Sequence, residues 1–349
     1  MRRTQAEVGA NPSSIHKTGL KAMRTVELAR NLIAERLGVA PETVTFTSGA
    51  TESNNLALKG AIWAARGGHL VVSAIEHPSV LDVATWLEET GQATVTRVPV
   101  DREGRVRVDD VAAALQPDTR VVSVMLANNE IGSVQPVEEL GRLCRSRGVL
   151  LHTDATQGLF KVPLDVAMVD LVTFNGHKIH GPKGVGALYV RPGVELTPLF
   201  HGGGHELGRR SGTLNVAGIA GLGEAVRLYV PGDADTLRAH RQGLLARLRE
   251  LFPKLYVNGP EDGGLPAVLN VGFPGQSGKW LAKDLDKRGI QVSASSACHA
   301  TELTPSHVIL ALGRTPEEAD EALRVSFGRQ TRPEHLDALV AALTELVKP

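Results

Sequence analysis

Short apolar, β-branched runs alternate with longer amphipathic segments from about residue 17 to residue 230. The runs have the features of strands, because they are rich in β-branched and apolar residues and too short for helices. These runs are residues 44–47, 70–73, 120–125, 149–153 and 171–174. Between two of them, segment 136–147 has a helical pattern and is followed by Gly148, which suits a left-handed helix C-terminus. The alternation predicts an α/β fold with a mostly parallel sheet.

This alternation breaks at residues 230–233, where Val-Pro-Gly-Asp interrupts the pattern. A long charged amphipathic helix is predicted directly afterwards, over 233–251. We therefore expect a large domain at 1–230 and a smaller α+β domain at 231–349.

Three local signals stand out in the smaller domain. The run Thr315-Pro316-Glu317-Glu318 predicts a helix start, because Thr is a good N-cap, Pro suits the first helical position and Glu completes a capping box. Thr304-Pro305 predicts a second helix start. Residues 291–304 are small and polar with no apolar period, so they predict an exposed loop, and this loop carries Cys298.

Composition and charge limit the partners of the chain. Of the 349 residues 42% are apolar, which excludes disorder as the main state. Lys plus Arg and Asp plus Glu both number 38, and no dense basic block occurs, so neither nucleic acid nor an anionic membrane is an expected partner. No run approaches about 18 apolar residues, the N-terminus turns polar at once, and there are only two cysteines. We expect a cytoplasmic protein with free thiols and a small-molecule partner.

Polar residues follow two of the predicted strands. Asp154 stands at the end of strand 149–153, with Gln157 three residues later, and Lys178 follows strand 171–174 in the run Asn175-Gly176-His177-Lys178. Parallel sheets bind ligands at the carboxyl ends of their strands, although a helix N-cap and a surface charge are the simpler readings of a lone Asp and a lone Lys. Together the two fit pyridoxal phosphate, which needs an amine for a Schiff base and an anion beside its pyridine nitrogen.

A phosphate site is predicted at residues 45–55, which run from strand through a small-residue turn into a helix. Such a turn aims backbone N–H groups, and here the Thr51 hydroxyl, at an anion. Nucleotide binding is disfavoured, because no Walker A motif occurs and the G-x-G at 221–223 lies inside a helical pattern.

Histidines and thiols supply the remaining candidates. Neither His177 with His180 nor His201 with His205 forms a zinc motif, so metal catalysis is disfavoured. His77 follows a strand and could stack on a ring or move protons, although such a residue is more often structural. Cys144 lies on the apolar side of a helix and is expected to be buried, whereas polar neighbours surround Cys298. Cys298 is therefore the candidate nucleophile, with its thiolate promoted by His299 or a cofactor-bound base.

Several long motifs, in order from residue 11 to about residue 329, resemble the cysteine desulfurases of the class V aminotransferase family. The motifs are Asn11-Pro12-Ser13-Ser14-Ile15-His16, the turn at 48–55, Asn128-Asn129-Glu130-Ile131-Gly132, residues 154–157, residues 176–184, residues 201–213 and Ser296-Ala297-Cys298. The resemblance implies the pyridoxal phosphate fold of type I. It also implies conversion of L-cysteine to L-alanine, with the sulfur passed on for iron–sulfur cluster or thiolation pathways.

The resemblance further implies a role for each matched residue. Lys178 would form the Schiff base and move the substrate α-proton, while Asp154 and Gln157 would pair with the ring nitrogen and ring oxygen. His77 would stack on the ring and act in proton transfer. Asn129 would contact cofactor and substrate, Arg324 would bind the substrate carboxylate, and Cys298 would carry the sulfur as a persulfide to an acceptor protein. The phosphate would be held by Ala50, Thr51, Asn175 and His177, with Thr213 reaching the phosphate of the other subunit in a homodimer.

The chain departs from the family pattern at three places. Ten residues precede Asn11 where a longer segment is usual, Asn175 replaces a Ser but can still donate to phosphate, and a Gly usual before Ser296 is absent. Two alternatives stay open: another class V enzyme, either an aminotransferase or a selenocysteine lyase, in which Cys298 is dispensable, and a cofactor-free regulatory relative.

Overall fold

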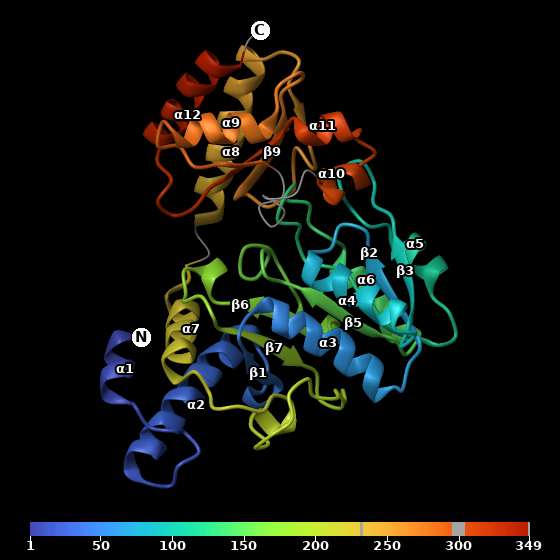
Figure 1. The fold of residues 1–349 in the computed structure, drawn as a ribbon, viewed down its shortest axis with the longest axis vertical. Helices are drawn as coiled ribbons and strands as arrows, with labels where there is room; N and C mark the ends of the chain where they lie inside the picture. Colours follow the sequence, from blue (N-terminus) through green and yellow to red (C-terminus); the bar gives the residue numbers. More distant parts are fainter. Residues whose placement is uncertain (231–232, 295–303, 348–349) are drawn as a thin grey trace. The chain divides into compact units, whose positions relative to one another are not determined.

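The computed structural model describes residues 1–230, 233–294 and 304–347. The chain forms two compact units, drawn as ribbons in Figure 1. The first comprises Met1–Val98, Val108–Leu126 and Pro136–Tyr229, and the second comprises Pro99–Arg107, Ala127–Gln135 and Val230–Pro349. Two short segments from within the N-terminal part of the sequence therefore belong to the second unit.

A seven-stranded sheet forms the centre of the first unit, in the order β1-β7-β6-β5-β4-β2-β3. Pairing is parallel from β6 through β5, β4 and β2 to β3, and only β7 runs antiparallel to its two neighbours. The sheet confirms the predicted α/β class. Its strands are β1 (Val44–Thr47), β2 (His69–Ser73), β3 (Thr94–Val98), β4 (Thr119–Ser123), β5 (Leu150–Asp154), β6 (Leu171–Asn175) and β7 (Gly186–Val190).

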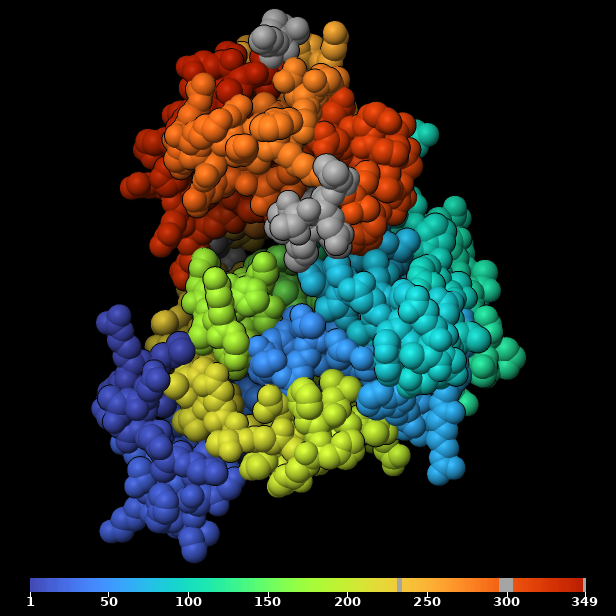
Figure 2. Space-filling model, in the orientation of Figure 1, coloured from blue at the N-terminus to red at the C-terminus, as the bar shows by residue number. Residues whose placement is uncertain are grey.

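Helices surround this sheet because a parallel pair needs a crossover connection. They are α1 (Arg2–Glu7), α2 (Lys17–Leu37), α3 (Ala50–Ala64), α4 (Pro78–Glu89), α5 (Val108–Ala114), α6 (Val137–Ser146) and α7 (Val216–Leu228), with 3-10 turns η1 (Pro41–Thr43), η2 (Val166–Met168), η3 (His177–Ile179) and η4 (Glu206–Gly208). Helix α3 packs on the central strands and on α4, and their apolar faces are fully buried. Helices α1 and α2 pack against α7, and Figure 2 shows this blue N-terminal segment on the surface beside yellow residues of the first unit.

The second unit has a four-stranded antiparallel sheet in the order β10-β11-β9-β8. Its core is built from leucines of α8 and α12 together with Phe273 and the buried residues of β9 and β11. The strands are β8 (Tyr256–Val257), β9 (Val268–Gly272), β10 (Ser293–Ala294) and β11 (Ala322–Ser326), and the helices are α8 (Asp233–Leu251), α9 (Gly278–Asp286), α10 (His307–Ala311), α11 (Pro316–Asp320) and α12 (Pro333–Leu346).

Most of the elements predicted from the sequence are present. Strand β1 and helix α8 have the predicted bounds, and Gly148 has the expected left-handed backbone with φ of 67°. The capping box at α11 is formed, with the Glu318 N–H donating to Thr315 Oγ1 at 3.2 Å and the Thr315 N–H donating to Glu318 Oε2 at 2.9 Å.

Two local predictions in the second unit were wrong. The helix expected at Thr304 begins at His307 instead, because the Ser306 side chain is the N-cap that accepts from the Ile309 N–H. Residues 293 and 294 were expected in a loop, but they form a short edge strand, in which Ser293 pairs with Arg324 and Ala294 with Leu323 of β11. None of the described helices has the length and apolarity needed to cross a membrane.

Candidate functional site

Adjacent parallel strands place Asp154 and the segment of Lys178 at one edge of the first sheet. Asp154 is the last residue of β5 and lies opposite Thr173 of β6. Strand β6 ends at Asn175, and the next turn, η3, carries Lys178. The Lys178 N–H donates to Asn175 Oδ1 at 3.3 Å, which fixes the turn, and the Lys178 side chain is exposed. Both residues follow strands whose carboxyl ends share an edge, which is where open α/β sheets bind ligands.

Asp154 is a buried carboxylate held by two donors. Its Oδ1 accepts from the Thr156 N–H at 2.9 Å and its Oδ2 accepts from Asn54 Nδ2 at 2.8 Å. Asn54, on α3, is fully buried and also donates from Nδ2 to Ser79 Oγ at 2.8 Å. Ser79 Oγ lies 2.9 Å from Nδ1 of His77, the N-cap of α4. The structure thus joins His77 to Asp154 through Asn54, which lies in the motif at 48–55, and through Ser79, which no signal in the sequence identified.

A second buried carboxyl, Glu76, lies beside this group. Its Oε1 accepts from Ser73 Oγ at 2.6 Å and from the Met125 N–H at 2.7 Å. Burial raises the pKa of Glu76 to about 8, and the charge of Asp154 adds to the rise although both hydrogen bonds oppose it. Glu76 is therefore mostly protonated at neutral pH. The only signal for it in the sequence is a charged residue that directly follows an apolar run.

The N-terminus of α3 has the features expected of an anion cradle. Its N-cap is Gly49, which has no side chain to cap the first N–H groups, and the helix begins at Ala50. Thr51 is exposed in the first turn. The Ser48 N–H is not available, because it donates to Glu52 Oε2 at 2.8 Å. The prediction of backbone donors at this turn therefore applies to the N–H groups after residue 49.

Glu52 in turn anchors a distant segment of the first unit. Arg210 Nε donates to Glu52 Oε1 at 2.8 Å. Burial opposes ionisation of Glu52, but the hydrogen bonds from Arg210 and Ser48 lower its pKa overall. This ion pair fixes the segment that carries Thr213, which is exposed three residues later.

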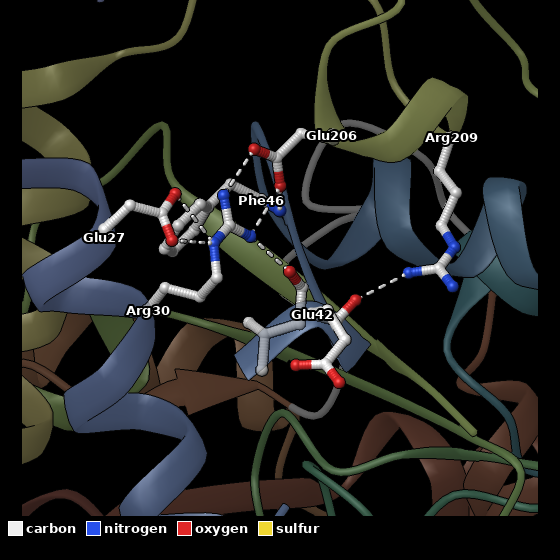
Figure 3. A network of polar contacts seen from close by, with 7 residues as sticks. Glu27, Arg30, Glu42, Phe46, Glu206 and Arg209 are labelled. Atoms are coloured by element: carbon white, nitrogen blue, oxygen red, sulfur yellow. Dashed lines mark hydrogen bonds and ion pairs between the residues drawn. The ribbon is translucent and has the colours of Figure 1, made fainter. Parts of the chain in front are cut away.

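The same segment is anchored a second time by a buried ion pair, drawn in Figure 3. Arg30 of α2 makes two bonds to Glu206, with Nη2 to Oε1 at 2.7 Å and Nη1 to Oε2 at 3.0 Å, and Glu206 also accepts from the Phe46 N–H at 2.7 Å. Figure 3 shows the Arg30 guanidinium between the carboxylates of Glu27 and Glu206. These bonds hold Glu206 in a left-handed conformation with φ of 53°, which is rare outside glycine.

The remaining first-unit candidates follow the strands in the same way. Asn175 is buried, and its Oδ1 already accepts from the Lys178 N–H, so its Nδ2 is the group available for donation to a phosphate. Gln157 is half-buried in the turn after β5. His177 is exposed; desolvation, together with the charges of Lys178 and Lys183, lowers its pKa, so this imidazole is neutral at neutral pH.

Two candidates belong to the second unit. Arg324 lies on β11, and its Nη1 donates to the Asn129 carbonyl at 3.1 Å, so the structure brings these two residues together. The neighbouring Glu130 is buried and accepts from Ser306 Oγ at 2.6 Å. Burial raises the pKa of Glu130 to about 7, although Ser306 and the charge of Arg324 oppose the rise.

The two thiols differ in what the structure describes. Cys144 is buried as expected, and burial, with a smaller contribution from Asp170, raises its pKa to about 12, so it is not a nucleophile. Cys298 lies outside the described residues, and so does His299. Among the residues that are described, no group of three or more His, Cys, Asp or Glu side chains is placed to hold a metal ion.

Two orphaned polar atoms test whether the site suits a polar cofactor. Asn54 Oδ1 and Thr156 Oγ1 are buried without a hydrogen-bond partner among the described residues, and both belong to residues that donate to Asp154. Buried polar atoms normally have partners, so such atoms indicate a place for a polar ligand. A buried carboxyl group, a lysine and an uncapped helix N-terminus within one unit fit pyridoxal phosphate. The fold and the site together define the class of pyridoxal phosphate enzymes with a fold of type I.

Comparison with known proteins identifies the family. Residues 2–339 match the aminotransferase class-V family, and the chain belongs to that family. It is 40% identical over 347 residues to the cysteine desulfurase IscS of Clostridium botulinum strain Hall, covering 97% of this chain and 87% of that protein. It is 44% identical over 337 residues to cysteine desulfurase IscS of Serratia proteamaculans, covering 94% and 82%.

Solved structures agree with this assignment. A NifS-like protein superimposes with a TM-score of 0.91 at 36% identity, covering 98% of this chain and 93% of that chain. SspA in complex with cysteine superimposes with a TM-score of 0.84 at 36% identity, covering 93% of each chain.

Proposed function

We propose that this protein is a pyridoxal phosphate-dependent cysteine desulfurase, which converts L-cysteine to L-alanine and passes the sulfur to an acceptor. The observation that carries the proposal is the placement of Asp154 and Lys178 after adjacent parallel strands, in a chain 40–44% identical to cysteine desulfurases over nearly its whole length. The SspA relative was solved with cysteine bound, which supports cysteine as the substrate class.

The first unit would hold the cofactor. When bound, pyridoxal phosphate supplies an aldehyde for a covalent link to an amine and a ring that withdraws electrons. Lys178 would supply that amine, and its Nζ would accept the α-proton of the substrate. Asp154, held in place by Asn54 and Thr156, would pair with the ring nitrogen, and Gln157 would donate to the ring oxygen. The phosphate donors would be the N–H groups of Ala50 and Thr51, the Thr51 hydroxyl, Asn175 and His177.

The second unit would orient the substrate. Arg324 keeps one nitrogen on the Asn129 carbonyl, which fixes the direction of its guanidinium. Its planar charge suits the substrate carboxylate, because arginine pairs with carboxylates in two parallel hydrogen bonds. Cys298 would accept the substrate sulfur as a persulfide and pass it to an iron–sulfur scaffold or a thiolation protein.

Three finer statements belong to this proposal and stay predictions. The enzyme would be a homodimer in which Thr213 reaches the phosphate of the other subunit, and it would act in the cytoplasm. The large domain, residues 1–230, would bind the cofactor, and the small domain, residues 231–349, would carry the cysteine loop.

Incubation with L-cysteine and a reductant tests the proposal, with alanine and sulfide measured together. We expect equal amounts of both. Lys178→Ala should abolish the visible absorption of the bound cofactor and all turnover, whereas Cys298→Ala should keep the absorption and lose sulfide production. Cys144→Ala is the matched control, because this thiol is buried and should not affect sulfide release.

The outcomes separate the alternatives. Undiminished sulfide release by Cys298→Ala would exclude the persulfide and favour another class V enzyme, such as a selenocysteine lyase or an aminotransferase. Purified protein that never acquires visible absorption, even with excess cofactor, would favour a cofactor-free regulatory relative.

A further inference from the structure

The hydrogen-bond chain from Asp154 to His77 has a fixed direction. Asn54 Nδ2 faces both Asp154 Oδ2 and Ser79 Oγ, each at 2.8 Å. A flipped amide would place Asn54 Oδ1 against the carboxylate oxygen with no proton between them, so the nitrogen must face Asp154. Because Ser79 Oγ accepts from Asn54, its own proton is available for His77 Nδ1 at 2.9 Å.

A backbone donor on the same nitrogen favours the same tautomer. The Ser79 N–H donates to His77 Nδ1 at 3.1 Å, and the peptide plane fixes the position of that proton. Nδ1 therefore accepts one bond from the backbone and a second from the Ser79 hydroxyl, so it carries no proton. The neutral imidazole must carry its proton on Nε2.

We propose that Asn54 and Ser79 are positioning residues that fix His77 as the Nε2–H tautomer. The ring then presents a donor, not an acceptor, to the cofactor and substrate. Burial makes the arrangement rigid, since Asn54 is fully buried and Ser79 is 9% exposed. Asn54 cannot pass a proton from Ser79 to Asp154, because an amide N–H is too weak an acid to release its proton. The chain of bonds therefore orients the imidazole and does not conduct protons. This inference rests on the proposed function in one respect, which is that His77 acts on the cofactor and substrate.

Histidine-selective ¹⁵N NMR tests the tautomer directly, on the apo protein and on the cofactor-loaded enzyme. The correlations between each ring nitrogen and the ring carbon-bound protons distinguish Nδ1–H from Nε2–H, and His77→Gln assigns the signal. We expect the Nε2–H pattern for His77 in both forms. Asn54→Leu and Ser79→Ala should raise the share of the Nδ1–H tautomer, because only the backbone bond from Ser79 then acts on Nδ1, and Ser79→Thr should lower that share again.

Turnover of L-cysteine supplies the second readout. Asn54→Leu should lower kcat by about tenfold, as for one lost hydrogen bond, with a smaller change in KM. Ser53→Ala is the matched control, because Ser53 is the neighbouring buried residue on α3 and bonds to Thr47 Oγ1 at 2.8 Å instead. It should leave both the NMR pattern and kcat unchanged.

The two readouts separate the possible failures. An Nδ1–H pattern in the unmodified protein, or a share of the Nδ1–H tautomer that rises in neither Asn54→Leu nor Ser79→Ala, would overturn the proposal. An altered pattern with unchanged kcat would show that the bonds exist but do not serve the reaction, which also overturns the positioning role. If the unmodified enzyme does not turn over cysteine, the proposed function fails, while the NMR pattern still decides the tautomer.

Discussion

Replacing the buried Glu76 by Gln should make the stability of this protein less sensitive to alkaline pH. Glu76 has a pKa of about 8 in the folded chain, against a value of 4.5 for the unconstrained carboxyl. Between these values the unfolded chain has lost the proton and the folded chain still holds it. Because the unfolded state then binds fewer protons, stability falls as the pH rises, by about 1.4 kcal/mol for each pH unit.

The expected size follows from that slope. Across the whole interval the loss is about 5 kcal/mol, an order-of-magnitude figure set by burial and by repulsion from Asp154. Glu76→Gln keeps an oxygen that accepts from Ser73 and Met125 but cannot ionise. Its advantage in free energy of unfolding over the unmodified protein should therefore grow by about 2.5 kcal/mol between about pH 6 and about pH 8.

Equilibrium unfolding in urea at both pH values measures this difference, with protein concentration and cofactor loading held equal. Glu224→Gln is the matched control. Glu224 is exposed on α7, and its hydrogen bond to Arg227 lowers its pKa, so it stays charged at both pH values. Its effect on stability should not change with pH. If the Glu76→Gln advantage is equally independent of pH, the reasoning from burial is refuted.

Three further substitutions test ion pairing and packing. Glu206→Gln should cost about 3 kcal/mol, because the buried Arg30 guanidinium then keeps only the partly exposed Glu27 as its counter-charge. Thermal unfolding would measure the loss, and a cost as small as that of Glu224→Gln would contradict this reasoning. Gly243→Ala should raise stability by about 0.5–1 kcal/mol, since the position is exposed within α8 and an added Cβ meets nothing. Gly141→Ala on α6 should instead lower stability by about 1–3 kcal/mol, because its Cβ would lie 2.3 Å from the Met168 carbonyl oxygen. Urea unfolding compares the two glycine variants, and the opposite order of stabilities would contradict the packing argument.

The order of strands and helices along the chain could be predicted from the sequence, because the signals for each element are local. Short runs rich in β-branched residues predicted strands such as β1, and capping residues predicted the start of α11. Asp154 and Lys178 could be identified as site candidates for the same reason. Asp154 stands at the end of one such run and Lys178 follows the next by four residues, and the carboxyl ends of parallel strands share an edge.

The sequence did not show which segments join each unit, and it did not show whether the buried carboxyl groups are protonated. Nothing local shows that residues 99–107 and 127–135 join the second unit, since that depends on packing against distant strands. The helix start at His307 was also missed, because Thr304 and Ser306 are both good caps.

By itself, then, the amino-acid order determined which residues are candidates for the site, since the pattern of apolar positions already places Asp154 and Lys178 near strand ends. Only the tertiary structure decided how those residues are charged and oriented. The protonation of Glu76 and the bonds from Asn54 to Asp154 and Ser79 depend on burial and on contacts between separate elements. Desolvation and hydrogen-bond direction act through space, so the chain must fold before either is defined.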